Sequence, residues 1–130
     1  MTITDNKPQK LRRLTLFLYG FGFTNIATAF TVPLFFAESL LWQPRSLATD
    51  LMVGSLYLAL GIVMVSAAKR PEQHKALIDF IILSSLLHGA VMVVFAQQPL
   101  HIAIDALFLG LMGLIPLWAY PWPRHQLLRF

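Results

Sequence analysis

The sequence contains no cysteine and few charged residues. Without cysteine, disulfide bridges and thiolate metal centres are excluded, and the redox state of the compartment cannot be read. Asp, Glu, Lys and Arg make up 12% of the 130 residues, whereas soluble domains carry about 25%. Because a water-facing surface needs more charge than this, most of the surface is expected to face an apolar medium.

Several signatures of known chemistry are also missing. The sequence has no Walker loop, no Gly-x-Gly-x-x-Gly fingerprint and no His-Glu-x-x-His motif, so nothing in it points to nucleotide or zinc-protease chemistry. It has no internal repeat either. We assign no catalytic residue, and an enzyme is the less favoured class. The basic residues lie at the ends of apolar stretches, where topology explains them, so no nucleic-acid partner is expected.

Four apolar stretches fill most of the chain, at about 14–36, 48–68, 76–96 and 100–120. A helix needs roughly 20 apolar residues to cross a bilayer core ~30 Å thick, whereas a barrel strand needs about 10. Helices also satisfy their own backbone hydrogen bonds in lipid. The sequence therefore predicts an all-α, four-transmembrane-helix bundle, a single membrane domain over residues 1–130 with short tails at 1–13 and 121–130.

Prolines and aromatic residues punctuate these stretches. Pro99 follows a very short link after the third stretch, so the third and fourth helices are predicted to be antiparallel neighbours. Pro33 and Pro116 lie inside apolar stretches and are predicted to kink their helices. An aromatic cluster at the end of the fourth stretch is typical of headgroup depth, and consists of Trp118, Tyr120 and Trp122.

The distribution of Lys and Arg predicts the orientation. All but one of the ten Lys and Arg residues lie in the N-terminal tail, in the loop at 69–75 or in the C-terminal tail, and the exception is Arg45. With four crossings these three regions share one side of the membrane, which the positive-inside rule makes cytoplasmic. We therefore expect a multi-pass protein of a bacterial inner (plasma) membrane with both termini in the cytoplasm.

Polar residues inside a membrane span are costly, so each needs an explanation. Counting 1.5 Å per residue from the cytoplasmic boundary puts Asn25 and Tyr57 at ~16 Å, His88 at ~18 Å, Asp105 at ~22 Å and Asp50 at ~27 Å. Every stretch thus supplies a polar group to the middle or outer half of the bundle. We expect these five residues to line a polar pocket that binds a small ligand, a quinone or haem, or relays protons.

The residue pairs in this pocket leave alternatives open. An imidazole–carboxylate pair of His88 with Asp105 suits proton transfer or ligand binding. A metal site of His88, Met92 and His101 is less favoured, because a Met near a His on a helix is more often ordinary packing.

The bland alternative is interhelical hydrogen bonding. Each such hydrogen bond contributes about 0.6 kcal/mol to stability, and this packing role is the favoured explanation for Asn25, Ser84 and Ser85. Asp79 is expected to cap the third helix, where its charge suits the positive helix end.

Small residues indicate where helices come close. Gly54 and Gly61 share one face of the second stretch, and Gly110 and Gly113 lie on the fourth. The alternative function is therefore a non-catalytic accessory subunit that packs into a larger membrane complex. Membrane lipid is the expected surrounding, and the partners would be other membrane subunits or further copies of this chain.

Two runs resemble a family of small four-helix bacterial membrane proteins, catalogued as a domain of unknown function. Residues 50–61 (DLMVGSLYLALG) resemble its second helix, with an acidic residue, Met, Tyr and Leu-Gly, and residues 84–92 (SSLLHGAVM) resemble its Ser-Ser-x-x-His-x-x-x-Met run. Asp105 matches a late acidic position. The family usually has Glu where Asp50 stands, and often Gly where Ile104 stands. The resemblance spans about 50–108 and implies the four-helix fold and these sites, but no activity.

Overall fold

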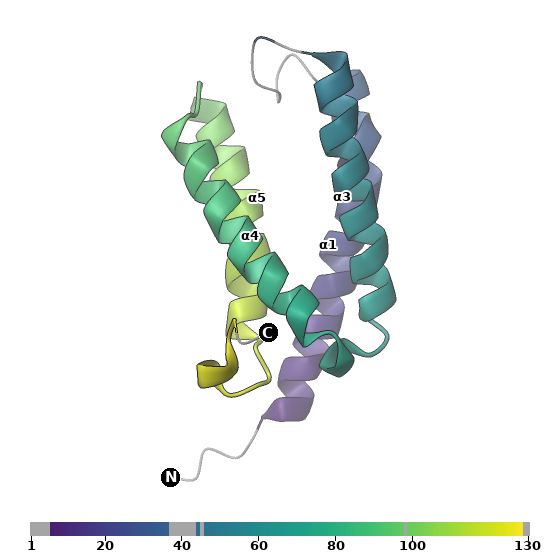
Figure 1. Cartoon of the computed structure of the whole chain (residues 1–130), viewed down its shortest axis with the longest axis vertical. Coiled ribbons are helices and arrows are strands. Elements are labelled where there is room, and N and C mark those ends of the chain that lie inside the picture. Colours follow the sequence, from purple (N-terminus) through teal and green to yellow (C-terminus); the bar gives the residue numbers. More distant parts are fainter. Residues whose placement is uncertain (1–5, 37–43, 45, 98, 129–130) are drawn as a thin grey trace.

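The computed structural model describes residues 6–36, 44, 46–97 and 99–128. In this part of the chain the structure is all-α, as predicted, with four long helices (Figure 1). They are α1 (Lys7–Phe35), α3 (Leu47–Ala67), α4 (Lys75–Val94) and α5 (Pro99–Trp118), and two short 3-10 helices are η1 (Pro71–Gln73) and η2 (Arg124–Gln126). Helices α1, α3 and α4 are long and apolar enough to cross a membrane, and the apolar part of α5 is the shorter run Ile102–Trp118.

The helix starts follow from local sequence. Pro8 lies in the first turn of α1 and Pro99 begins α5, positions where the missing N–H of proline costs nothing. Ser46 caps α3 by accepting a hydrogen bond from the backbone N–H of Thr49 at 3.4 Å. Helix α1 begins at Lys7, ahead of the apolar stretch that starts at Leu14, because the intervening Lys, Gln and Arg residues are good helix formers. Part of the expected N-terminal tail is therefore helical.

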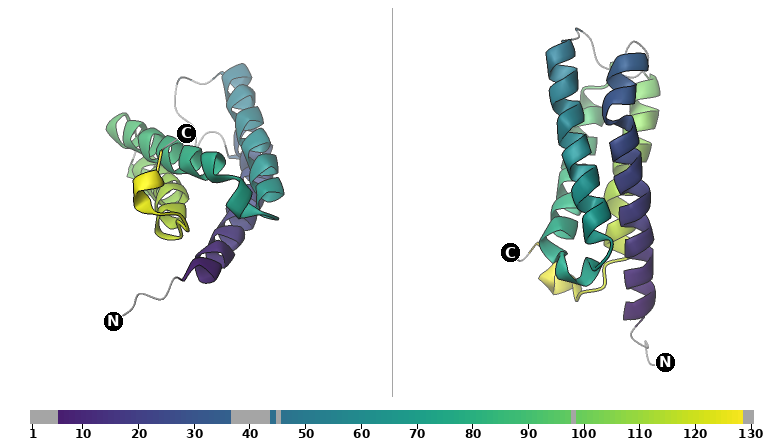
Figure 2. Two further views of the ribbon diagram at one scale, coloured as in Figure 1. Left: turned by 60° about the horizontal axis from the view of Figure 1, so that its bottom comes forward. Right: turned by 90° about the vertical axis from the view of Figure 1, so that its right-hand side faces the viewer.

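The long helices form two pairs, α1 packed along α3 and α4 packed along α5. The pairs come together where α3 leads into α4 and where α5 ends, and they diverge toward the opposite end (Figure 1). We call these the convergent end and the splayed end. Contact between the pairs is mainly between α1 and α5. The first turns of α1 reach beyond the other helices at the convergent end (Figure 2).

The hydrophobic core lies at the convergent end. Every long helix contributes to it, with the buried side chains Leu14, Phe17, Leu18, Met64, Ala67, Ala68, Ile78, Ile81, Ile82 and Met112, and with Ala119 and Tyr120 just after α5. These residues come from the first half of α1, the end of α3, the start of α4 and the end of α5. Side-chain packing therefore holds the pairs together at one end, which leaves the other end splayed.

Glycines bring the backbones of α1 and α3 into contact. A Cβ atom at Gly54 would collide with the carbonyl oxygen of Ala29, and one at Gly61 would lie 2.6 Å from the carbonyl oxygen of Gly22. The prediction that Gly54 and Gly61 allow close helix approach is therefore confirmed, with α1 as the neighbour.

On α5 the two glycines differ. A Cβ at Gly113 would lie 2.8 Å from the side chain of Leu86 on α4, so this glycine also permits close approach. A Cβ at Gly110 would meet nothing within 4 Å, so the expectation of close packing there is wrong.

Helix α1 continues past Pro33 and α5 past Pro116, and both prolines are buried.

The Gly54 contact predicts that Gly54→Ala destabilises the protein by about 1–3 kcal/mol, because the new methyl group forces α1 and α3 apart. Gly110→Ala is the matched control, since its methyl group enters open space. The measurement is reversible unfolding in mixed detergent micelles, followed by far-ultraviolet circular dichroism. Equal stability of the two variants would contradict the packing role of Gly54.

Candidate functional site

Tyr57 and His88 face each other across the gap between the two helix pairs. Tyr57 lies in the middle of α3 and His88 in the second half of α4. The phenol oxygen of Tyr57 is 3.4 Å from Nδ1 of His88, which is longer than a typical hydrogen bond and makes this a weak one. Tyr57 is half-buried and His88 is exposed. These two predicted site residues, from different helix pairs, are therefore brought together.

A cleft of about 390 Å³ surrounds this pair, within the size range of small-molecule sites. Its walls come from three helices: Val53, Leu56, Tyr57 and Leu60 from α3, Phe80, Ser84, Ser85 and His88 from α4, and Leu109 and Met112 from α5. Most of these side chains are apolar. The cleft therefore has the phenol and imidazole as its main polar point on a largely apolar surface, beside the hydroxyl groups of Ser84 and Ser85.

The chemistry of this polar point is hydrogen bonding. A phenol donates one hydrogen bond, and a neutral imidazole donates from one nitrogen and accepts at the other. With its proton on Nε2, His88 accepts the Tyr57 hydroxyl at Nδ1 and keeps an N–H donor for a ligand oxygen. The arrangement suits a carbonyl or hydroxyl group on an apolar molecule.

Asn25 lies elsewhere, in the contact between α1 and α3. Its side chain is fully buried, and its amide nitrogen donates to the carbonyl oxygen of Phe21 at 2.8 Å and approaches the sulfur of Met64 at 3.8 Å. Its oxygen has no hydrogen-bond partner among the described residues. Asn25 does not line the cleft, so its place in the structure is that of a residue between packed helices.

The remaining predicted site residues are dispersed or undescribed. Asp50 lies in the first turn of α3, at the splayed end, and does not line the cleft. Met92 is half-buried near the end of α4 and does not line it either. His101 and Asp105 belong to α5, but their side chains lie outside the described residues. The predicted pair of His88 with Asp105 thus stays a prediction.

The described residues contain no group of three or more His, Asp or Glu side chains that could hold a metal ion. Of the two members of the predicted metal set whose side chains are described, His88 lines the cleft and Met92 does not. A metal site of His88, Met92 and His101 remains a prediction, because the side chain of His101 is not described.

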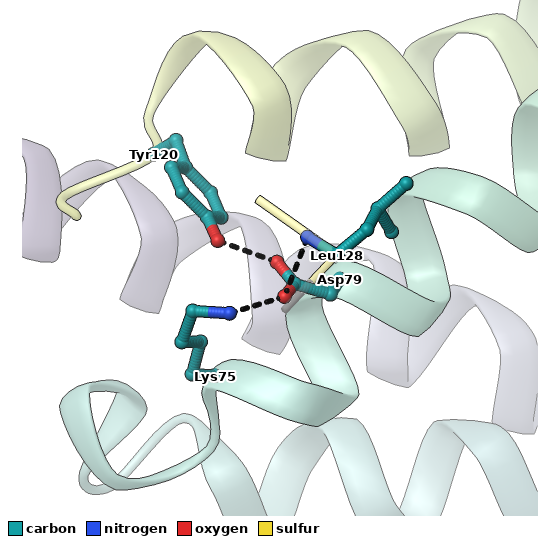
Figure 3. Close-up of polar contacts among 4 residues, drawn as sticks. All are labelled: Lys75, Asp79, Tyr120 and Leu128. Atoms are coloured by element: carbon teal, nitrogen blue, oxygen red, sulfur yellow. Dashed lines mark hydrogen bonds and ion pairs between the residues drawn. The ribbon is translucent and has the colours of Figure 1, made fainter. Parts of the chain in front are cut away.

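A second polar cluster, which the sequence did not reveal, surrounds Asp79 at the convergent end (Figure 3). Its carboxylate is fully buried. One oxygen accepts a hydrogen bond from the hydroxyl of Tyr120 at 2.6 Å, and the other accepts from the Lys75 ammonium at 2.5 Å and from the backbone N–H of Leu128 at 3.2 Å. The expectation that Asp79 caps the helix is wrong, because its carboxylate faces the chain that returns after α5. The N-cap residue is His74.

The Asp79 cluster fixes the segment after α5 against the bundle. Leu128 has a φ of 58°, a left-handed conformation that is unfavourable for a branched side chain. The hydrogen bond from its N–H to Asp79 helps to hold this conformation. Three donors around one carboxylate compensate for its burial, since an unpaired charge in an apolar interior would be very costly.

The same cluster alters the titration of Tyr120. Burial, together with the hydrogen bond to the Asp79 carboxylate and its negative charge, raises the pKa of Tyr120 well above its ordinary value. The folded protein therefore holds the phenol proton more tightly than the unfolded chain. This contribution to stability is complete below a pH of about 10 and is lost as the pH rises further.

Sequence reasoning missed this cluster because its parts are far apart in the chain. Tyr120 was assigned to the aromatic end of the fourth stretch, where it packs edge-on against Trp122 at 5.2 Å between ring centroids. The available signal was a carboxylate one turn into an apolar helix with Lys75 four residues before it, a spacing that places both on one helix face.

Comparison with known proteins gives a family and no activity. A family model described as a family of unknown function, DUF6632, matches residues 7–115. The chain therefore belongs to this family, and the resemblance noted in two runs of the sequence extends over most of its length. No curated protein and no solved structure matches the chain.

The Asp79 cluster predicts that Asp79→Asn lowers the free energy of unfolding by about 1–3 kcal/mol, because a neutral amide at this buried position accepts the three hydrogen bonds less strongly and places its own N–H group against donors. The pKa of Tyr120 should also fall, which the ultraviolet absorbance of the phenolate during an alkaline titration would detect. Glu72→Gln is the control, since Glu72 is an exposed acid at the same end. If both variants unfold and titrate alike, Asp79 does not hold this end together.

Proposed function

We propose that this member of the DUF6632 family is an integral membrane protein that binds a lipophilic small molecule with a polar oxygen-bearing head, such as a quinone, in the cleft at Tyr57 and His88. The observation that carries the proposal is the tyrosine–histidine pair in a largely apolar cleft between two helix pairs. Haem, held by the imidazole of His88, is the other ligand that the residues suit.

Membrane insertion with four crossings is part of the proposal. Three helices have the length and apolar character to cross, and α5, with 20 residues, is about 30 Å long, which matches the hydrocarbon core. Large exposed apolar side chains occur on all four helices, among them Phe23, Leu56, Leu87 and Leu107. Such a surface suits lipid and would promote aggregation in water.

The proposed orientation places the convergent end in the cytoplasm of a bacterial inner membrane. The start of α1, the connection from α3 to α4 and the chain after α5 all lie at this end (Figure 1). Lys7, Lys10, Lys69, Arg70 and Lys75 belong to these segments, and positive charge is retained on the cytoplasmic side. The cleft then lies near the middle of the membrane, because its lining residues come from the central parts of α3, α4 and α5.

Because the chain has no cysteine, single cysteines test this topology. We expect a membrane-impermeant thiol reagent to label Gln97→Cys in cells whose outer membrane alone is permeable, and to label Lys69→Cys only after the inner membrane is disrupted. Both positions are exposed between helices. Labelling of Lys69→Cys in intact inner membranes would refute the orientation. Labelling of both positions from the same side would show that α4 and α5 do not cross the membrane.

Ligand binding is tested with the protein in lipid nanodiscs, using a short-tailed ubiquinone, menaquinone and haem as probes. We expect one probe to bind, and His88→Ala to weaken its affinity about tenfold, which is the upper range for one neutral hydrogen bond. Tyr57→Phe should weaken binding less, because it removes the partner of the imidazole and keeps the imidazole itself.

His74→Ala is the matched control, because His74 is an exposed histidine at the convergent end, outside the cleft. If none of the probes binds, or if His74→Ala and His88→Ala behave alike, the ligand site is wrong. Co-purification of the chain with other membrane polypeptides at fixed stoichiometry, unaffected by His88→Ala, would instead support the alternative of an accessory subunit.

A further inference from the structure

A second hollow lies between α1 and α5, apart from the proposed ligand cleft. It has a volume of about 520 Å³, and we call it the α1–α5 groove. Helix α1 lines it from Arg13 to Thr24, and α5 contributes Ile115 and Trp118. None of its lining residues belongs to the cleft at Tyr57 and His88, so the two sites are independent.

The groove is charged at one end and apolar along the rest. Among its lining residues the polar side chains are Arg13, at the convergent end, and Thr24, at the far end. The hydroxyl of Thr24 donates to the carbonyl oxygen of Gly20 at 2.9 Å, so its hydrogen is used within α1. A ligand that fits this pattern has an anionic group at one end and a hydrocarbon chain attached to it.

Arg13 is placed to receive an anion. Its guanidinium lies 4.2 Å from the ring centroid of Trp118, a contact that holds its plane against the indole. No ion pair joins Arg13 to a carboxylate in the part of the chain that the structure describes. Lys10 precedes it by one helical turn on the same face and adds positive charge. Such a stacked guanidinium can present its N–H groups to two oxygens of a phosphate.

The apolar length of the groove fits one leaflet. From Arg13 to Thr24 helix α1 rises about 16 Å, close to half of a ~30 Å hydrocarbon core. Gly20 lies along this length, and a Cβ atom there would meet nothing within 4 Å. Gly20 is therefore not needed for helix packing, in contrast to Gly22 two residues later, and its missing side chain keeps the groove open.

We propose that the α1–α5 groove binds one anionic phospholipid, with its phosphate on Arg13 and an acyl chain along Gly20. In the proposed orientation this lipid comes from the cytoplasmic leaflet, whose surface is negatively charged. The site would hold the first turns of α1 at the headgroup layer and fill the space that α1 and α5 leave between them.

The test is native mass spectrometry of the full chain after incubation in mild detergent with phosphatidylglycerol or phosphatidylcholine of the same acyl chains. We expect one phosphatidylglycerol per chain to bind in preference to phosphatidylcholine. Arg13→Gln should reduce this preference about fivefold, the factor that corresponds to about 1 kcal/mol for one basic residue at an anionic lipid surface. Arg13→Lys should restore most of it.

Gly20→Leu keeps every charge and fills the groove, so it should abolish the bound lipid. Gly110→Leu is its matched control, because Gly110 also has open space at the Cβ position but lies outside the groove. Arg12→Gln is the control for charge, since Arg12 is an exposed neighbour that does not line the groove.

Three results of the lipid-binding measurements would overturn the proposal. They are equal binding of the two lipids by the unaltered chain, undiminished phosphatidylglycerol binding by Gly20→Leu, and equal losses in Arg12→Gln and Arg13→Gln. A dimer that Gly20→Leu dissociates without loss of bound lipid would also overturn it, since the occupant would then be a second copy of the chain. Failure of the quinone or haem site leaves these results unaffected.

Discussion

The structure depends on packing that is concentrated at one end. Leu14, Leu18, Met64, Ile78 and Met112 are all at most 1% exposed and belong to one cluster at the convergent end. Lipid is as apolar as these side chains, so in a membrane their close contacts, rather than escape from water, hold the helices together. Because few contacts join the two helix pairs beyond this cluster, the pairs diverge, and the cleft at Tyr57 and His88 lies where they do.

Each helix pair is held by small residues, so the pairs can behave as stiff units. In the first pair Gly54 and Gly61 bring α3 against backbone carbonyl groups of α1, and in the second Gly113 receives the side chain of Leu86. Such contacts leave little room for movement within a pair. Relative movement of the pairs about the convergent end would change the width of the cleft, so a ligand bound there would favour one separation of the pairs over others.

The polar groups divide between the two ends according to what surrounds them. Asp79 is fully buried, and it is surrounded by Lys75, Tyr120 and the N–H of Leu128. A charge in this position is stable only because every oxygen has a partner. Tyr57 and His88 meet in a wider space and have contact with each other. The first cluster is saturated and therefore structural, whereas in the second the imidazole of His88 uses Nδ1 and has its other ring nitrogen for a further hydrogen bond.

Much of the fold could be predicted from the sequence, because it depends on local pattern. Apolar length gave the four helices, and spacing gave the close approach at Gly54 and Gly61. Gly110 shows the limit of that argument, since a glycine beside open space has the same local sequence character as one in a helix contact. Only the position of the neighbouring helix distinguishes the two.

For the candidate site, predicted depth in the membrane grouped Tyr57, His88 and Asn25 together. The structure brings Tyr57 and His88 together but places Asn25 elsewhere. Asn25 lies at a similar predicted depth but turns toward α3, against Met64. The depth of a residue along a helix follows from the sequence, whereas the direction in which its side chain points depends on how each helix is rotated about its own axis when the helices pack. The Asp79 cluster was missed for a related reason, because its partner Tyr120 lies 41 residues away and the returning chain has no periodic pattern to place it.

The two proposed sites differ in a way that follows from the same splayed architecture. The cleft lies between the helix pairs, about halfway along them, so its shape depends on their separation. The α1–α5 groove begins at Arg13 and Trp118, near the convergent end where the core holds the helices, so its shape depends little on that separation. A lipid in the groove would anchor the fixed end of the molecule at the membrane surface. The splayed end would then lie toward the opposite leaflet, and the proposed ligand would reach the cleft between the two helix pairs from the hydrocarbon phase.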